Sequence, residues 1–191
     1  MSPEEVLAFW FADAPAEYRD IWFRASPEFD AACAARFSDA LRKARSGALN
    51  DWANEPRSTL ALVILLDQLS RNIHRGSPEA YRADKHALAI ARTALTRGFD
   101  AQLGPVERVF LYLPFMHAEG MAEQEESVRL FEGLRGTFDG ADAAIDAARR
   151  HRDLIQRFGR FPHRNAVLGR ASTPEEQAFI AEPGRRSKRR P

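Results

Sequence analysis

Apolar residues recur along most of this 191-residue chain at spacings of three and four, which is typical of amphipathic helices. No segment alternates polar and apolar residues with a period of two, so strands are not expected. Four stretches begin with Ser-Pro-Glu or Thr-Pro-Glu, where the hydroxyl caps a helix, proline fits its first position and the acid faces its positive end. The pattern predicts about nine helices, at residues 3–11, 16–24, 27–46, 57–71, 78–97, 105–117, 120–134, 141–158 and 174–181.

The predicted fold class is all-α, with antiparallel helix pairs joined by short turns in a single domain over residues 1–183. A composition of 45% apolar and 29% charged residues agrees with a globular protein. Five of the 28 basic residues lie in the segment 185–190, so we expect residues 184–191 to form a disordered basic tail. The remainder is mildly acidic, which disfavours nucleic acid as a partner.

The cysteine content and the apolar runs indicate a cytoplasmic protein without a membrane span. Cys33 is the single cysteine, so no internal disulfide can form, and its spacing from Phe29 and Phe37 predicts a core thiol. The N-terminus has no secretory pattern, and the longest apolar run, at residues 60–66, is too short to cross a bilayer. The oligomeric state is left open by these observations.

Two helices are expected to be buried at the centre of the molecule. One contains the apolar run 60–66, and the other contains residues 109–116, with Pro114 predicted to kink it. Both end in polar residues, which meet if the helices pack side by side in the same sense. Asp67 and Arg71 share one helix face. Either the two form a structural ion pair, or Asp67 orients an arginine toward a ligand.

The segment RFGRFPHRNAVLGR, residues 157–170, is the strongest candidate for a functional site, and we call it the arginine segment. It holds four arginines and no acid, and its aromatic residues suggest that the guanidinium groups are held in place. These groups either form a structural network with buried acids or bind an anionic small molecule or a peptide carboxylate. The residues expected to bind such a ligand are Arg71, Asn72, His74, Arg75, Gln124, Arg160, Arg164 and Asn165.

Two other functions are kept open. In a hydrolase-type enzyme, His117 or His163 would act as the general base and Glu119 would orient it. In an RNA-binding protein, the basic tail and the arginine segment would contact phosphates. His151 is expected in the core. No paired spacing of Cys or His residues and no glycine-rich phosphate loop is present, so neither a metal site nor a cofactor is predicted.

Three long segments carry a resemblance to a known family: LALVILLDQLSRNIHRG, FLYLPFMHAEGMAEQ and RFGRFPHRNAVLGRASTPEE. They resemble the bacterial domain-of-unknown-function family nine hundred and twenty-four, in order and over roughly residues 3–180. The resemblance implies an all-helical fold, a tetratricopeptide-like right-handed superhelix, and it brings no established activity. Ser70 departs from the family pattern where proline is expected, which favours a straighter helix, and Ala118-Glu119-Gly120 departs from it beside His117.

Overall fold

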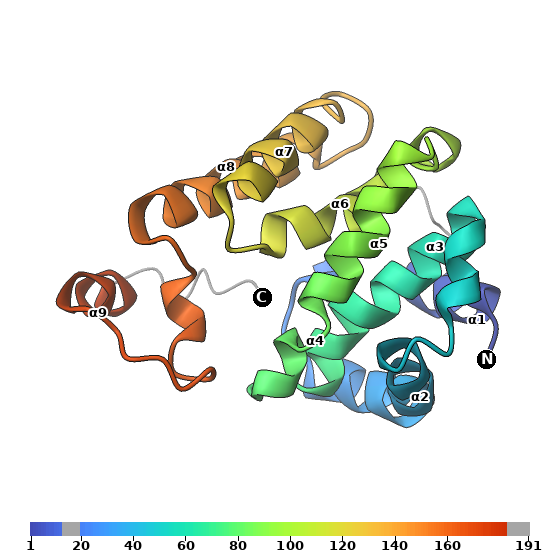
Figure 1. Cartoon of the computed structure of the whole chain (residues 1–191), viewed down its shortest axis with the longest axis horizontal. Helices are drawn as coiled ribbons and strands as arrows, with labels where there is room; N and C mark the ends of the chain where they lie inside the picture. The colour runs from blue at the N-terminus through green and yellow to red at the C-terminus, as the bar shows by residue number, and fades with distance from the viewer. Residues whose placement is uncertain (13–19, 183–191) are drawn as a thin grey trace.

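The computed structural model describes residues 1–12 and 20–182, which fold into helices and contain no strand (Figure 1). The all-α prediction is therefore confirmed over these residues. The α-helical segments are α1 (Pro3–Phe11), α2 (Pro27–Arg45), α3 (Pro56–Val63), α4 (Ser70–Ile73), α5 (Asp84–Thr96), α6 (Pro105–His117), α7 (Met121–Glu132), α8 (Ala141–Phe158) and α9 (Pro174–Ala181). The superhelix implied by the family resemblance stays a prediction.

A six-residue π-helical segment, η3 (Ile64–Leu69), joins α3 to α4 without a break, so the chain is helical from Pro56 to Ile73. Its wider turn is seen where the Ser70 amide donates to the carbonyl of Leu65, five residues earlier. The helix thus continues through Ser70, which is favoured because serine, unlike the proline of the family pattern, has a backbone amide that can donate a hydrogen bond. Short π-helical stretches occur often at functional sites, which draws attention to the residues that η3 carries.

The predicted helix 78–97 is wrong in its first turn. Residues Pro78–Tyr81 form a 3₁₀ turn, η4, and α5 begins only at Asp84. The carbonyl of Ala80 accepts the Ser70 hydroxyl at 3.1 Å, and the carbonyl of Glu79 accepts the Arg45 guanidinium. These side chains therefore bond two carbonyl groups that, in an α-helix, would accept hydrogen bonds from backbone amides four residues later.

Residues 16–19 of the predicted helix 16–24 and the whole basic tail fall outside the described residues. Within 20–24 the structure holds a single 3₁₀ turn, η1 (Asp20–Trp22), where an α-helix was expected. Further 3₁₀ turns are η2 (Asn50–Asn54), η5 (Asp100–Gln102) and η6 (Pro162–Arg164). The positions of 16–19 and of the tail are not described.

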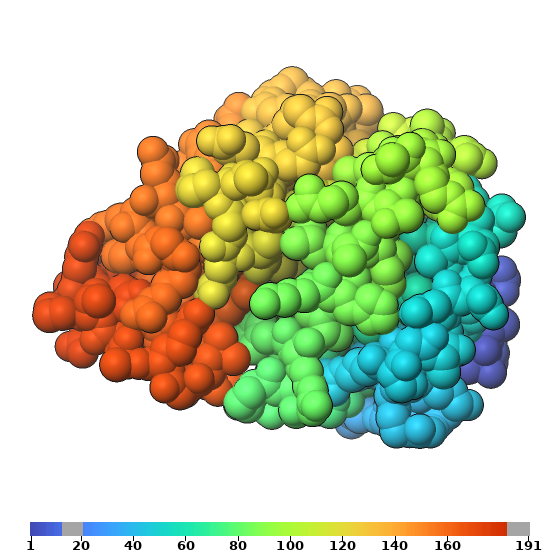
Figure 2. All heavy atoms as spheres, in the orientation of Figure 1, coloured from blue at the N-terminus to red at the C-terminus, as the bar shows by residue number. Residues whose placement is uncertain are grey.

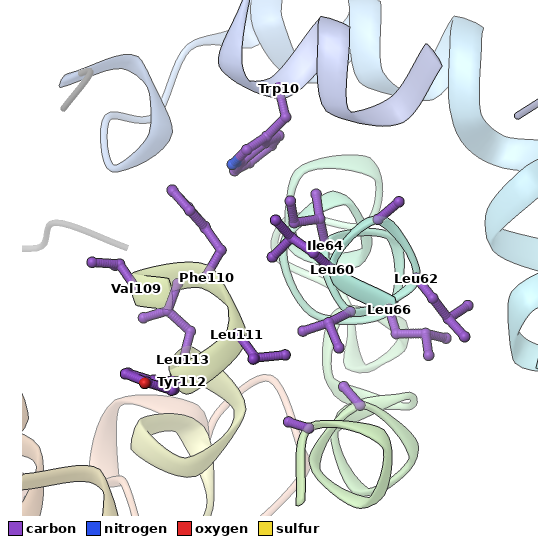
Figure 3. Close-up of a cluster of buried hydrophobic side chains, with 14 of the residues drawn as sticks. Trp10, Leu60, Leu62, Ile64, Leu66, Val109, Phe110, Leu111, Tyr112 and Leu113 are labelled. Atoms are coloured by element: carbon purple, nitrogen blue, oxygen red, sulfur yellow. The ribbon is translucent and has the colours of Figure 1, made fainter. Parts of the chain in front are cut away.

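The core lies around the two helices that were predicted to be central. Figure 3 shows Trp10 of α1 and Phe110 of α6 on one side of the α3–η3 helix, with Leu62 pointing away from them on its other side. The ring centroids of Phe110 and Trp22 are 4.7 Å apart, and the Trp22 indole donates to the carbonyl of Trp10 at 2.8 Å. Cys33 is fully buried, and burial raises the pKa of its thiol to about 12, as expected of a core cysteine.

The C-terminal part of the chain closes one side of this arrangement. Helix α7 packs against both α6 and α8, and η6 and α9 come after α8 in the chain. Figure 1 draws this last segment in orange to red, at one end of the molecule. In the space-filling view the same C-terminal residues reach the green segment that contains η4 (Figure 2). Among the described residues, no helix is both long and apolar enough to cross a membrane.

Candidate functional site

The polar ends of the two central helices meet, as expected from packing in the same sense. We use the name polar cluster for the six residues that gather there from four parts of the chain: Asp67, Arg71, Tyr81, Asp84, His117 and Arg164. The first two come from the η3–α4 helix, the next two from η4 and α5, His117 from the last turn of α6, and Arg164 from η6. The packing of helices far apart in sequence thus builds one polar site.

Asp67 is the buried centre of the polar cluster. Its carboxylate has no exposed surface, and its two oxygens lie 2.8 and 2.9 Å from Nδ1 of His117. Arg71 approaches one oxygen at 3.0 Å, and Gln68 donates to the other at 2.6 Å. Burial alone would raise the pKa of Asp67, but Arg71 and His117 outweigh it and hold that pKa well below its usual range. Asp67 is therefore ionised at neutral pH.

The tautomer of His117 follows from this contact. An ionised carboxylate only accepts hydrogen bonds, so Nδ1 of His117 carries the proton and Nε2 keeps its lone pair. Burial and the nearby Arg71 lower the pKa of His117 to about 4, against the attraction of Asp67. The imidazole is therefore neutral at pH 7, with the unprotonated Nε2 that a general base needs.

Asp84 stands between the two arginines of the polar cluster and is less well paired than Asp67. Its Oδ2 accepts from Arg71 at 2.9 Å and lies 3.6 Å from the guanidinium of Arg164. Its Oδ1 is buried and has no hydrogen-bond partner among the described residues. Burial raises the pKa of Asp84, although Arg71 opposes this. The ionised form is thus favoured less strongly here than at Asp67.

Arg164 is the least satisfied member of the polar cluster. Its side chain is 7% exposed, it makes no hydrogen bond to a described residue, and its Nε is buried without a partner. The guanidinium lies over the rings of Tyr81 and Phe161, at 4.9 and 4.5 Å from their centroids. Burial and the neighbouring Arg71 lower the pKa of Arg164 to about 10, so it stays charged at neutral pH.

The rest of the arginine segment is paired with acids of the protein. Arg160 donates to both oxygens of Glu176 at 2.6 and 2.8 Å, and Arg170 donates to both oxygens of Glu119 at 2.7 and 3.0 Å. Arg157 reaches Glu175 at 2.8 Å. Hydrogen bonds from Arg160 and from the Thr173 amide lower the pKa of Glu176 to about 2. These three arginines form the structural network that was one of the two interpretations.

The expected partnership of Glu119 with His117 is wrong. Glu119 instead accepts from Arg170 and from the Phe161 amide at 2.8 Å. The chain turns at Ala118, directly after α6, so Glu119 no longer shares the helix face of His117. His163 is exposed on η6, with its ring 5.6 Å from that of Phe161. His117 therefore has a carboxylate partner, but the carboxylate is Asp67.

His151 lies beside the polar cluster and is only partly buried, where a core position was expected. Its ring centroid is 6.4 Å from that of His117 and 5.4 Å from that of Phe161. Its Nδ1 bonds the carbonyl of Ala147 at 2.8 Å. Burial lowers the pKa of His151 to about 4, against the effect of this hydrogen bond.

The other predicted ligand-binding residues lie in separate places. Asn72 and Arg75 both bond Asp30, the first at 2.8 Å and the second at 2.5 and 2.9 Å. Asn165 bonds Glu176 and Ser172. Gln124 donates to the last carbonyls of α6, and His74 faces a different hollow. Two of the eight residues predicted to bind a ligand, Arg71 and Arg164, belong to the polar cluster. The other six lie outside it.

Asp84 and Tyr81 were not anticipated as site residues. Asp84 sits in the first helical turn of α5 and reads in sequence as an ordinary helix-start acid. Tyr81 precedes it in a turn. The stacking of Tyr81 with arginines from two distant segments depends on the tertiary packing of η4, which no local pattern predicts.

Comparison with known proteins places the chain in a family. A family model described as bacterial protein of unknown function (DUF924) matches residues 6–184. The solved structure of a protein of unknown function from Agrobacterium tumefaciens is similar to this chain, with 38% sequence identity and a TM-score of 0.85. The match covers 94% of this chain and 96% of that one. The comparison with curated proteins found no match. The chain belongs to the DUF924 family of bacterial proteins of unknown function.

Proposed function

We propose that this protein is a binding module for a carboxylate, presented by a small molecule or by a peptide C-terminus, and that Arg164 receives it. The observation that carries the proposal is the guanidinium of Arg164, which is buried and charged yet makes no hydrogen bond to a described residue. Such a group normally has a bidentate partner, because an unsatisfied buried charge is costly. A carboxylate matches the planar fork of the guanidinium.

Neighbouring side chains support binding at this position. The guanidinium of Arg164 lies over the rings of Tyr81 and Phe161, which restrict its movement. Arg164 therefore loses little side-chain entropy when a ligand binds. Arg71, Asp84 and His117 keep 16%, 19% and 13% of their side-chain surface exposed, so the polar cluster is reached from solvent. Two arginines here face two carboxylates, and the raised pKa of Asp84 allows that residue to take up a proton when an anion arrives. Binding should therefore strengthen as the pH falls.

The test is calorimetric titration of the full-length chain with succinate and with an acetylated tripeptide that ends in a free carboxylate. The unmodified protein should bind at least one of these probes saturably. Arg164→Gln should abolish the binding, and Arg164→Lys, which keeps the charge but not the fork, should weaken it at least tenfold. Arg157→Gln is the matched control in the same segment, because Arg157 is exposed and pairs with Glu175. Binding by Arg164→Lys at the original affinity would overturn the proposal, as would absence of binding to both probes.

A second candidate function is an enzyme of the hydrolase type. The observation that favours it is the contact of 2.8 Å between Asp67 and His117, which fixes the imidazole with an unprotonated Nε2. In this role Asp67 orients His117, and Arg164 stabilises negative charge that develops on the substrate.

An ester panel with His117→Gln tests this candidate. The substitution should lower hydrolysis by about 10²–10⁴-fold if His117 is the base. His86→Gln is the control, since His86 on α5 makes no hydrogen bond or ion pair with Asp67 or His117 among the described residues. Equal rates for the two variants would exclude this role for His117. RNA binding has less support, since three arginines of the segment are engaged by acids of the protein.

A further inference from the structure

A second cationic site lies outside the polar cluster, in a surface hollow of about 420 Å³ near the end of α2. We call it the arginine hollow. Its lining comes from the last turns of α2, from the turn after α4 and from the residue after η4: Ser38, Leu41, Arg42, Arg45, Ser46, His74 and Arg82. Three arginines and a histidine thus face one space. Its volume is in the usual range for a small-molecule site.

The charges around the arginine hollow do not balance. Arg42 and Lys43 share the carboxylate of Asp39, and Arg45 and Arg82 share that of Glu79. In the part of the chain that the structure describes, these four cations therefore have two carboxylate partners, which leaves an excess of two positive charges among them. A phosphate ester carries nearly two negative charges near pH 7 and offers three acceptor oxygens.

The arginines of the hollow are not there to bond the last carbonyls of a helix. Cations near a helix C-terminus commonly bind its last carbonyls. Here Arg45 donates instead to Ser70 at 2.9 Å and to the side chain and carbonyl of Glu79. Arg42 and Arg82 bond only carboxylates, so none of the three donates to a carbonyl of α2 or α4 in the part of the chain described.

Two groups in the arginine hollow have unused hydrogen-bonding capacity. The Nε of Arg45 is buried and has no hydrogen-bond partner within residues 1–12 and 20–182. The imidazole of His74 makes no hydrogen bond to a described residue, and burial beside Arg45 lowers its pKa, which keeps it neutral with one N–H to donate. Leu41 and the aliphatic stems of the arginines add apolar surface for an organic group.

The geometry points to the arginine hollow as a binding site for the phosphate ester of a small organic molecule. Arg42 and Arg82 would hold the outer phosphate oxygens, Arg45 and His74 the inner ones, and Leu41 would contact the organic part. This site is independent of the proposed carboxylate site at Arg164. Free inorganic phosphate shares the anion but not the apolar part, so the two ligands can be told apart by affinity.

The test is calorimetric titration of the full-length chain at fixed ionic strength, with inorganic phosphate in one arm and phenyl phosphate in the other. Phenyl phosphate should bind saturably, with a dissociation constant at least tenfold below that of inorganic phosphate. The double substitution Arg42→Gln with Arg82→Gln should weaken this binding at least tenfold. Both side chains are 71% exposed, so the fold should be unaffected.

Two control variants separate the sites. Arg92→Gln removes an arginine that is 56% exposed and pairs with Glu123 elsewhere on the surface, and it should leave binding unchanged. Arg164→Gln should also leave it unchanged, because Arg164 belongs to the polar cluster. The proposal is overturned if phenyl phosphate does not bind, if the two phosphates bind equally, or if the double variant keeps the original affinity.

Discussion

The structure makes Asp67 the charge on which the polar cluster depends, and Asp67→Asn tests this directly. The substitution preserves the shape of the side chain but removes its charge. It leaves the buried Arg71 with Asp84 as its remaining carboxylate, and it replaces one of the two oxygens that lie 2.8 and 2.9 Å from Nδ1 of His117 by an NH2 group, which cannot accept a hydrogen bond. The loss thus falls on two partners from different helices.

The expected cost follows from burial. Breaking a buried ion pair by removing one partner destabilises a protein by about 3–5 kcal/mol. In a chain of this size each kcal/mol lowers Tm by roughly 2–4 °C, so the expected fall in Tm is about 6–20 °C. Asp84→Asn is the matched control, because burial has already raised the pKa of Asp84 and its charge contributes less. We expect Asp84→Asn to cost about 1 kcal/mol, the net value of an ordinary hydrogen bond.

Urea unfolding at pH 7, followed by far-ultraviolet circular dichroism, measures both variants on one scale. The two unfolding free energies should differ by at least about 2 kcal/mol, with Asp67→Asn the less stable. Equal losses would show that the two carboxylates contribute alike. A loss below about 1 kcal/mol for Asp67→Asn would refute the argument that its ionised form holds the cluster together.

Three further predictions concern pH, the C-terminal helix and the buried thiol. His117 and His151 have pKa values of about 4 in the folded protein, below the ordinary value of about 6.5 for histidine. Between these two pH values the unfolded chain binds more protons than the folded one, so the free energy of unfolding falls as the pH falls. Urea unfolding should show that each histidine lowers this free energy by about 2 kcal/mol at pH 5. Arg160→Gln frees the carboxylate of Glu176, so trypsin should release α9 faster than from the unmodified protein, and equal rates would contradict its anchoring role. Cys33 should react with a disulfide reagent only in denaturant, since the pKa of its thiol is about 12; a fast reaction in buffer would contradict its burial.

Local signals were enough to predict most helices. The bounds of α1, α6, α8 and α9 match the predicted ranges, because each helix begins directly after a capping residue or a glycine. The turn η4 was missed for a non-local reason. The carbonyls that would have continued its helix are taken by Arg45 and Ser70, and nothing in the sequence around Pro78 indicates those partners.

The candidate site was predictable in part. The sequence placed Asp67 and Arg71 on one helix face and predicted that a carboxylate after an apolar run needs a partner. The identity of the second partner, His117, depended on how α6 packs against the η3 segment. Glu119 is closer to His117 in sequence, yet the chain leaves the helix between them. Sequence proximity thus named the wrong acid, since the direction of a side chain past a helix end is set by tertiary contacts.

The four arginines of the segment 157–170 give the strongest internal argument for a ligand at Arg164. Arg157, Arg160 and Arg170 each reach a carboxylate at 2.6–2.8 Å, so the segment as a whole is fixed against its acidic partners. Arg164 lies between them in the chain and is more buried than any of the three, yet its carboxylate is 3.6 Å away. Loose docking of the segment would lengthen all four contacts. The long contact is confined to the one arginine that the aromatic rings hold in place, which is the position where an external carboxylate would complete the network.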